Sequence, residues 1–362
     1  MKRSFFLSIF PTPKYLEMPA VGLDISDRSI KSVELKRLGD KLIVDKIIDY
    51  TLPLGLVESG NIKDSQKLTA EISNLARQYK IKQAMVSLPE EKAFIFKIKL
   101  PFMKRSEIRE AVELLLEEHV PLSAPDVVFD YEIIKEPGSK GEPYEISVSV
   151  LPKGVVCDYL QCFRSSLIKP LAFEVEAHAL ARSLIPRDNK GTVLLVDIGK
   201  TRTSFAIIDG SFLVFTSTVG DINGDAITKS IEKNLNINYA QAEKLKIEKG
   251  LLRSKDNEVV FYSLIPIVAS LKDEIARIKS YWRTRRLGQG NFKKIILCGG
   301  QSTLPGLTEY LTGSLGITVE VGNPWVNIMN FNDSIPPINL NQSLRYATAL
   351  GLALRSGGIR EL

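Results

Sequence analysis

The sequence predicts an α/β protein built from two related halves. A unit of apolar strand, aspartate, short polar turn and second strand occurs around Asp24 and again around Asp197, which indicates an internal duplication. Between and after these units, extended apolar runs alternate with segments whose apolar residues recur at helical spacing. The chain has 362 residues, of which 44% are apolar and 25% charged, so it is long enough for two or three folded units.

The first half opens with a strand at 22–25 and a polar turn at 26–29. A helix is expected at 65–79, because Leu68, Ile72 and Leu75 recur at helical spacing. Clean alternation at 145–151 predicts a half-buried strand. The other expected elements are strands at 30–35, 42–50 and 127–134, two strands within 84–100, and helices from Ser106 to before Pro121, at 154–166 and at 174–184.

The second half follows a linker at 186–191 and repeats the opening pattern. Asn238 with Gln241 three residues later forms a capping-box pattern, which places a helix at 239–249. The other expected elements are strands at 192–197, 204–209 and 293–298, and helices at 225–234, 265–286 and 343–354.

The two aspartates at the strand ends are the strongest functional signal. Backbone N–H groups in a tight turn after a strand can cradle phosphate oxygens, and a carboxylate facing the same space can hold Mg²⁺. Asp24 and Asp197 are therefore the candidate metal-binding residues. One such aspartate alone could simply cap its loop, whereas two equivalent turns facing each other would hold a triphosphate from both sides.

The residues of these two turns are the candidate phosphate ligands. They are Ser26, Arg28 and Ser29 in the first turn, and Gly199, Lys200, Thr201 and Thr203 in the second. The second turn is not a P-loop, because the glycine that a P-loop requires five residues before Gly199 is Leu194 here.

Two other segments could contact a nucleotide. Gly299 and Gly300 could let a base or ribose approach the backbone, although a strand followed by two glycines is also common packing; Ser302 could start the next helix. Glu243 and Lys246 could hold a ribose or simply face solvent.

Glu176 is the candidate catalytic residue. It lies between the duplicated halves, where a carboxylate could orient a hydrolytic water or be a surface acid on a hinge helix.

The composition excludes several classes of protein. Three cysteines are too few for a disulfide framework, and two histidines argue against a His-ligated metal hydrolase. The net charge of +6 is spread along the chain, and the basic stretch at 279–286 suits a helix end, so no nucleic-acid partner is expected. No run approaches the ~18 apolar residues of a membrane-spanning helix. Residues 1–18 are expected to form a flexible arm.

Taken in order, these pieces resemble the actin-like ATPase superfamily. Asp24 with its turn resembles the first phosphate motif, Asp197 to Gly199 the second, and Leu297 to Gly300 the adenosine motif. Within the superfamily the chain is most similar to the PilM family of type IV pilus assembly proteins, relatives of the cell-division protein FtsA. The closer match lies in segments 99–103, 106–111, 118–121, 128–131, 175–182 and 242–246, and in Gly224-Asp225 with Thr228.

The resemblance implies a bilobed, actin-like (ribonuclease-H-like) fold. The first lobe would span 19–188, with an inserted α+β subdomain at about 84–165, the second lobe 189–342, and a C-terminal helix at 343–362 would return to the first lobe. It also implies binding of ATP with Mg²⁺ in the cytoplasm, with Gly224, Glu243 and Lys246 on the nucleotide side, and slow or absent hydrolysis.

The family also implies a membrane-linked partner. The chain would bind the cytoplasmic N-terminal tail of an inner-membrane pilus protein similar to PilN, in the first lobe near the insertion. It would thereby lie at the periphery of the inner membrane, contact other components of the pilus machine, assemble into a ring, and act as a nucleotide-controlled scaffold.

Four positions depart from the family pattern. Ser26 stands where a glycine is usual, Asp27 adds a negative charge near the phosphates, Asn223 replaces a glycine, and Ala177 follows Glu176 where proline is common. These departures bear on hydrolysis more than on binding, and Asp27 could either repel phosphate or recruit the metal.

Two alternative functions use the same fold. A division protein like FtsA would carry a C-terminal amphipathic helix after a flexible linker, whereas this chain ends at Leu362, soon after the last expected helix. A small-molecule kinase would need a polar pocket, and residues 84–165 show no cluster of that kind.

Overall fold

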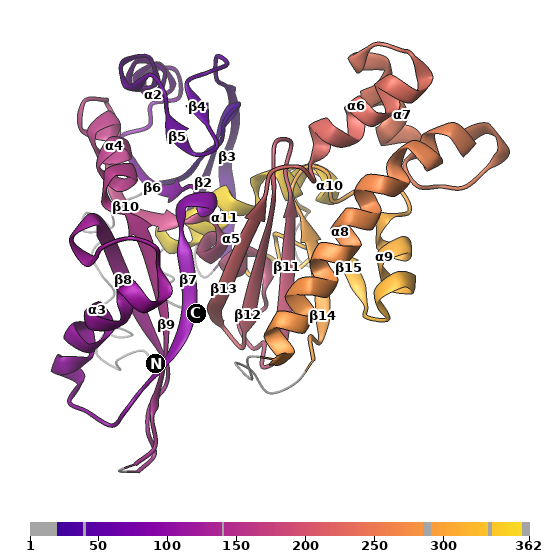
Figure 1. Cartoon of the computed structure of the whole chain (residues 1–362). Coiled ribbons are helices and arrows are strands. Elements are labelled where there is room, and N and C mark those ends of the chain that lie inside the picture. The colour runs from indigo at the N-terminus through magenta and orange to yellow at the C-terminus, as the bar shows by residue number, and fades with distance from the viewer. Residues whose placement is uncertain (1–19, 39–40, 140, 285–290, 332–334, 357–362) are drawn as a thin grey trace.

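A computed structural model describes residues 20–38, 41–139, 141–284, 291–331 and 335–356. The arm expected at 1–18 lies outside these residues, as do the last residues of the segments expected at 265–286 and 343–362. Two five-stranded sheets form the body of the molecule, and a three-stranded sheet lies beside them (Figure 1).

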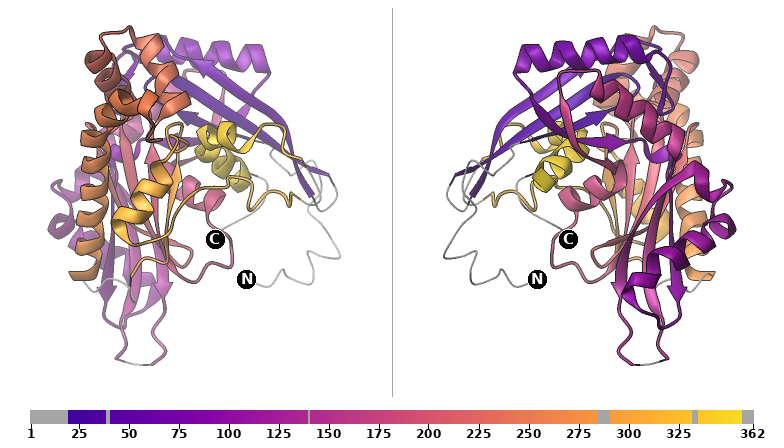
Figure 2. Two further views of the ribbon diagram at one scale, coloured as in Figure 1. Left: turned by 90° about the vertical axis from the view of Figure 1, so that its right-hand side faces the viewer. Right: turned by 90° about the vertical axis from the view of Figure 1, so that its left-hand side faces the viewer.

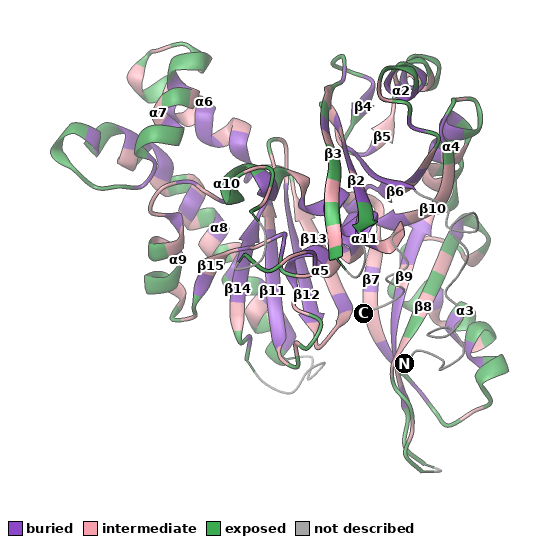
Figure 3. Cartoon of the chain, turned by 180° about the vertical axis from the view of Figure 1, so that it is seen from behind, coloured by how far each residue is buried: buried purple, intermediate pink, exposed green. Residues whose placement is uncertain are grey.

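The first sheet has the strand order β10-β6-β1-β2-β3. β1 pairs antiparallel with β2 on one side and parallel with β6 on the other. The strands are β1 (Val21–Ile25), β2 (Ser29–Leu38), β3 (Lys41–Thr51), β6 (Gln83–Leu88) and β10 (Lys169–Val175), and a short hairpin of β4 (Val57–Glu58) and β5 (Asn61–Ile62) follows β3. The central strand β1 is fully buried, whereas the edge strand β3 is largely exposed (Figure 3).

The second sheet repeats this arrangement with the order β13-β12-β11-β14-β15. Its first strand again pairs antiparallel with the next strand and parallel with a later one. The strands are β11 (Thr192–Ile198), β12 (Thr203–Asp209), β13 (Phe212–Val219), β14 (Lys294–Cys298) and β15 (Val319–Val321). Asp24 and Asp197 are each the second-last residue of the equivalent strands, β1 and β11, so the predicted duplication is confirmed.

Helices cover the sheets and join them. α2 (Ser65–Tyr79) and α4 (Lys153–Arg164) pack on the first sheet through Leu68, Ile72 and Phe163. α8 (Glu258–Thr284) lies along the second sheet (Figure 2). The other helices are α5 (Glu176–Leu184), α6 (Gly224–Leu235), α7 (Tyr239–Lys249), α9 (Leu307–Leu315), α10 (Leu340–Ser343) and α11 (Ala347–Ser356). α11 packs against α5 and β1, so the end of the described chain returns to the first sheet.

The three-stranded sheet forms a separate small core. It has the order β7-β9-β8, from β7 (Phe94–Leu100), β8 (Val127–Lys135) and β9 (Tyr144–Pro152), and packs on α3 (Ile108–His119) through Leu116, Ile146 and Val148. This unit lies within the range 84–165 expected for an insertion, although Gln83–Leu88 itself pairs in the first sheet. Ser147 on the polar face of β9 is buried and donates a hydrogen bond to the Leu213 carbonyl of β13. The predicted strand is confirmed, but its polar face is less exposed than expected: Glu145 and Ser149 are half-buried, and Ser147 is buried against the second sheet.

Several predicted boundaries differ from the structure. The helix expected from 174 begins at Glu176, because residues 169–175 form the parallel strand β10. Ser106 lies inside a 3₁₀ turn rather than at a helix cap, and α8 extends seven residues before the expected start at 265 because it accommodates Pro266 in its interior. The helix expected from 343 is broken into α10, a 3₁₀ turn and α11. The expected strand 22–25 and helices 65–79 and 239–249 are confirmed.

Candidate functional site

The turns that follow β1 and β11 lie against each other. Thr201 Oγ1 donates a hydrogen bond to Asp27 Oδ2 at 3.2 Å. Arg28, in the same turn as Asp27, forms an ion pair of 2.9 Å with Asp225 in the first turn of α6. The two turns therefore meet in the way that the duplication predicted.

The candidate metal-binding carboxylates end β1 and β11 beside this contact. Asp24 is 8% exposed, and its Oδ1 accepts a hydrogen bond of 2.9 Å from Ser87 Oγ. Asp197 lies close to Gly299, since a Cβ atom on that glycine would stand 2.1 Å from Asp197 Oδ1. Burial raises the pKa of Asp197 to about 6, with an opposing effect from Arg202 and a supporting effect from the charge of Asp24. The two carboxylates thus repel each other in a poorly solvated place.

This pair of carboxylates fits a magnesium ion that comes with a nucleotide. A divalent cation would relieve the repulsion between Asp24 and Asp197. Among the described residues, no group of three or more His, Cys, Asp or Glu side chains could hold a metal ion. Because Mg²⁺ commonly takes only one or two carboxylates together with water and phosphate oxygens, the donor set suits a metal–phosphate complex.

Arg202, which the sequence did not single out, forms ion pairs with two acidic side chains near the turns. Its Nη2 lies 2.9 Å from Glu176 Oε1, and its Nε lies 3.2 Å from Glu91 Oε2. Burial raises the pKa of Glu176 to about 8, although Arg202 opposes this shift. The candidate catalytic carboxylate is therefore already the partner of the half-buried Arg202 guanidinium.

Glu90 and Glu91 are the other residues that the sequence did not reveal. They form a 3₁₀ turn directly after β6, which ends beside β1. Glu90 is 2% exposed, and neither of its carboxylate oxygens has a hydrogen-bond partner among the described residues. Burial raises its pKa well above the usual value. The sequence signal that could have revealed these residues is the pair of adjacent glutamates after β6, the strand that pairs parallel with β1.

Some residues that were predicted to bind phosphate or adenosine form hydrogen bonds within the protein instead. Thr203 is fully buried and donates to the Ile222 carbonyl at 2.6 Å. Ser302 does not begin a helix: its hydroxyl donates to the Gly299 carbonyl at 2.8 Å, and α9 begins after Gly306. In the first turn, Ser26 Oγ donates to the Ser29 carbonyl at 3.0 Å, which shapes the turn.

The residues expected on the adenosine side lie in one connected region. The Gly224 N–H donates to the Gly199 carbonyl at 3.0 Å, and a Cβ at Gly224 would stand 2.6 Å from the Gln301 side chain. Lys246 is 2% exposed, with its Nζ 2.7 Å from Glu243 Oε2. The alternative of a solvated lysine at this position is therefore wrong. Gly300 lies next to Gly299 and faces Arg345.

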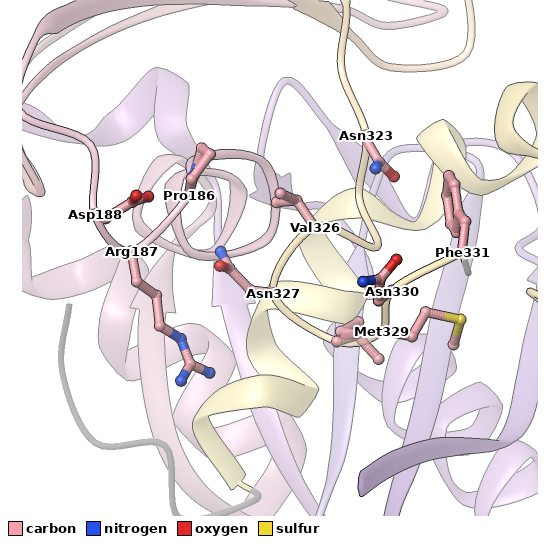
Figure 4. A pocket seen from close by; sticks show the side chains of 10 residues that line it. Pro186, Arg187, Asp188, Asn323, Val326, Asn327, Met329, Asn330 and Phe331 are labelled. Atoms are coloured by element: carbon pink, nitrogen blue, oxygen red, sulfur yellow. The ribbon is translucent and has the colours of Figure 1, made fainter. Parts of the chain in front are cut away.

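A pocket of about 710 Å³ lies elsewhere in the molecule. It opens between the linker after α5 and the segment after β15, and its lining residues are Pro186, Arg187, Asp188, Asn323, Val326, Asn327, Ile328, Met329, Asn330 and Phe331 (Figure 4). No predicted site residue lines it, so it is separate from the paired turns.

A protein-family model described as type IV pilus assembly protein PilM matches residues 22–357. The chain belongs to the PilM family. Solved structures are similar to this chain over nearly its whole length. A chain of a solved PilM–PilN type IV pilus biogenesis complex is 24% identical, with a TM-score of 0.77 over 94% of this chain and 99% of that chain.

More distant structures share the same fold. The ethanolamine utilization protein EutJ from Carboxydothermus hydrogenoformans is 15% identical with a TM-score of 0.53, over 95% of this chain and 91% of that chain. MreB5 of Spiroplasma citri bound to AMPPNP is 13% identical with a TM-score of 0.52, over 94% of this chain and 97% of that chain. The PilM-family chain therefore has the predicted actin-like ATPase fold. Within its described residues, no helix is long and apolar enough to cross a membrane.

Proposed function

We propose that this PilM-family chain is a nucleotide-binding scaffold of the type IV pilus machinery. The observation that carries the proposal is the contact between the turns after β1 and β11, where Thr201 meets Asp27. A ligand held by both turns would contact both five-stranded sheets at once. Its presence would therefore bias how the two halves of the molecule are positioned.

The proposed ligand is ATP with Mg²⁺. Asp24 and Asp197 would hold the metal, which would neutralise phosphate charge when bound. The turn residues Lys200 and Thr201 would hold the phosphates. Gly224, Gly299 and Gly300 would form the adenosine side; at the first two positions a side chain would also collide with Gln301 and Asp197 of the chain itself.

Slow or absent hydrolysis is part of the proposal. A water-activating carboxylate must be able to accept a proton from the attacking water. Glu176 is instead engaged by Arg202, with 2.9 Å and 3.1 Å from Arg202 Nη2 to its two oxygens. Nucleotide occupancy, rather than rapid turnover, would then control the scaffold.

The proposed partner is the cytoplasmic tail of an inner-membrane pilus protein similar to PilN. Support comes from family membership and from the similar chain, which was solved as a PilM–PilN complex. The tail would bind in the first lobe near the three-stranded sheet and bring the chain to the cytoplasmic side of the inner membrane. Contacts with other pilus components, ring assembly and lobe limits at 19–188 and 189–342 also belong to this proposal.

A peptide with the N-terminal sequence of the cognate PilN-like protein tests the proposal. Its affinity for the full chain is measured by fluorescence anisotropy with and without ATP and Mg²⁺. We expect binding whose Kd changes by about fivefold or more with nucleotide, and no such change in Asp197→Asn. An unchanged Kd would refute nucleotide control, and no binding would refute the partner.

A further inference from the structure

Asp27 has an unusual place in the first turn. Ser26 and Ser29 hydrogen-bond within their own turn, whereas the Asp27 carboxylate reaches the opposite turn and accepts a hydrogen bond from the Thr201 hydroxyl at 3.2 Å. Thr201 is one of the groups assigned above to a phosphate. This donor is therefore engaged by an anion from the chain itself.

The second oxygen of Asp27 shows that the contact is not a fully satisfied structural bridge. Asp27 Oδ1 is buried and has no hydrogen-bond partner among the described residues. A carboxylate oxygen in that condition has lost its hydration without receiving a donor in return. An ordinary loop-capping aspartate would direct such an oxygen at backbone N–H groups.

The surrounding charge makes Asp27 an obstacle to polyphosphate. Asp24, Asp197 and Glu176 are buried or nearly buried around the same turns, and Arg202 is engaged by Glu176 and Glu91. Arg28, the cation next to Asp27 in sequence, is paired with Asp225. A phosphate chain entering between the turns would meet the Asp27 charge at short range, where little water screens it.

We propose that the Asp27 carboxylate competes with a phosphate oxygen for the Thr201 hydroxyl and must be displaced from it when a nucleotide binds. This inference rests on the proposed nucleotide site. Asp27 would then be a residue that sets affinity and cation dependence: it weakens binding of any polyphosphate, and weakens it most when no divalent cation accompanies the ligand.

Calorimetry on the full chain tests this proposal with inorganic tripolyphosphate and with ATP, each in excess Mg²⁺ and in excess EDTA. Asp27→Asn should bind both ligands more tightly than the unmodified chain. The gain should be about tenfold in EDTA, corresponding to about 1.4 kcal/mol, and smaller in Mg²⁺. Adding Thr201→Val should reduce the gain, because the released hydroxyl is then missing.

Asp256→Asn is the matched control, because Asp256 is exposed and lies in the 3₁₀ turn before α8. It makes the same charge change and should leave both affinities unaltered. Equal or weaker binding by Asp27→Asn would overturn the inference, and weaker binding only in Mg²⁺ would identify Asp27 as a metal-side residue instead. If the folded, unmodified chain binds neither ligand, the proposed nucleotide function fails and this inference fails with it.

Discussion

At the scale of single residues, the site combines groups that the sequence reveals with groups that only the fold can reveal. Asp24 and Asp197 stand out in the sequence because they share a repeated pattern of strand, aspartate and turn, and Gly299 because it follows a strand. Arg202 and Glu91 do not, because their pairing joins residues of two different sheets. Thr203 was wrongly predicted to contact phosphate. Its place in the sequence does not reveal that its hydroxyl donates a hydrogen bond to the Ile222 carbonyl.

The raised pKa values of buried acids at the site predict how stability depends on pH. Burial raises the pKa of Asp197 from 3.8 to about 6 and that of Glu176 from 4.5 to about 8. The folded chain therefore binds protons that the unfolded chain has released, so the free energy of unfolding should fall as pH rises through this range. Thermal unfolding of the ligand-free chain between about pH 5 and pH 8.5 measures this fall. Asp197→Asn should remove its lower part, and an identical slope in this variant would contradict the assignment.

At the scale of elements, local signals decided which predictions succeeded. α2 was predicted correctly from the helical spacing of its apolar residues, and α7 from Asn238 and Gln241, which form its observed capping box. β10 and β15 were missed: a short strand in a parallel part of a sheet has no alternation to reveal it. The burial of Ser147 was missed because it depends on a sheet that is distant in sequence.

The packing of α11 against α5 requires a glycine at position 351, where the two helices approach closely. A Cβ atom at Gly351 would stand 1.8 Å from the Ala179 carbonyl oxygen, a backbone atom that cannot move aside. Gly351→Ala should therefore lower the free energy of unfolding by about 1–3 kcal/mol, as measured by urea denaturation. In Gly313→Ala, a helical control with nothing within 4 Å, stability should rise by up to about 1 kcal/mol. Equal effects of the two changes would contradict this close-packing account.

At the scale of the whole molecule, the duplication explains why one site can form from two distant segments. The two sheets share strand order and sense, so each places an aspartate near the end of its first strand. The sequence predicted this pairing, since the repeated pattern is local. It could not predict how the three-stranded sheet contacts the second sheet, or where the 710 Å³ pocket lies, because both depend on surfaces formed only after folding.

Isothermal titration of the full chain with ATP in excess Mg²⁺ is the most direct test of the paired-turn site. We predict one nucleotide per chain, with affinity at least about tenfold weaker in both Asp24→Asn and Asp197→Asn and unchanged in Asp256→Asn. If either of the first two variants, folded as judged by its thermal unfolding, binds ATP as tightly as the unmodified chain, the two turns do not share one ligand.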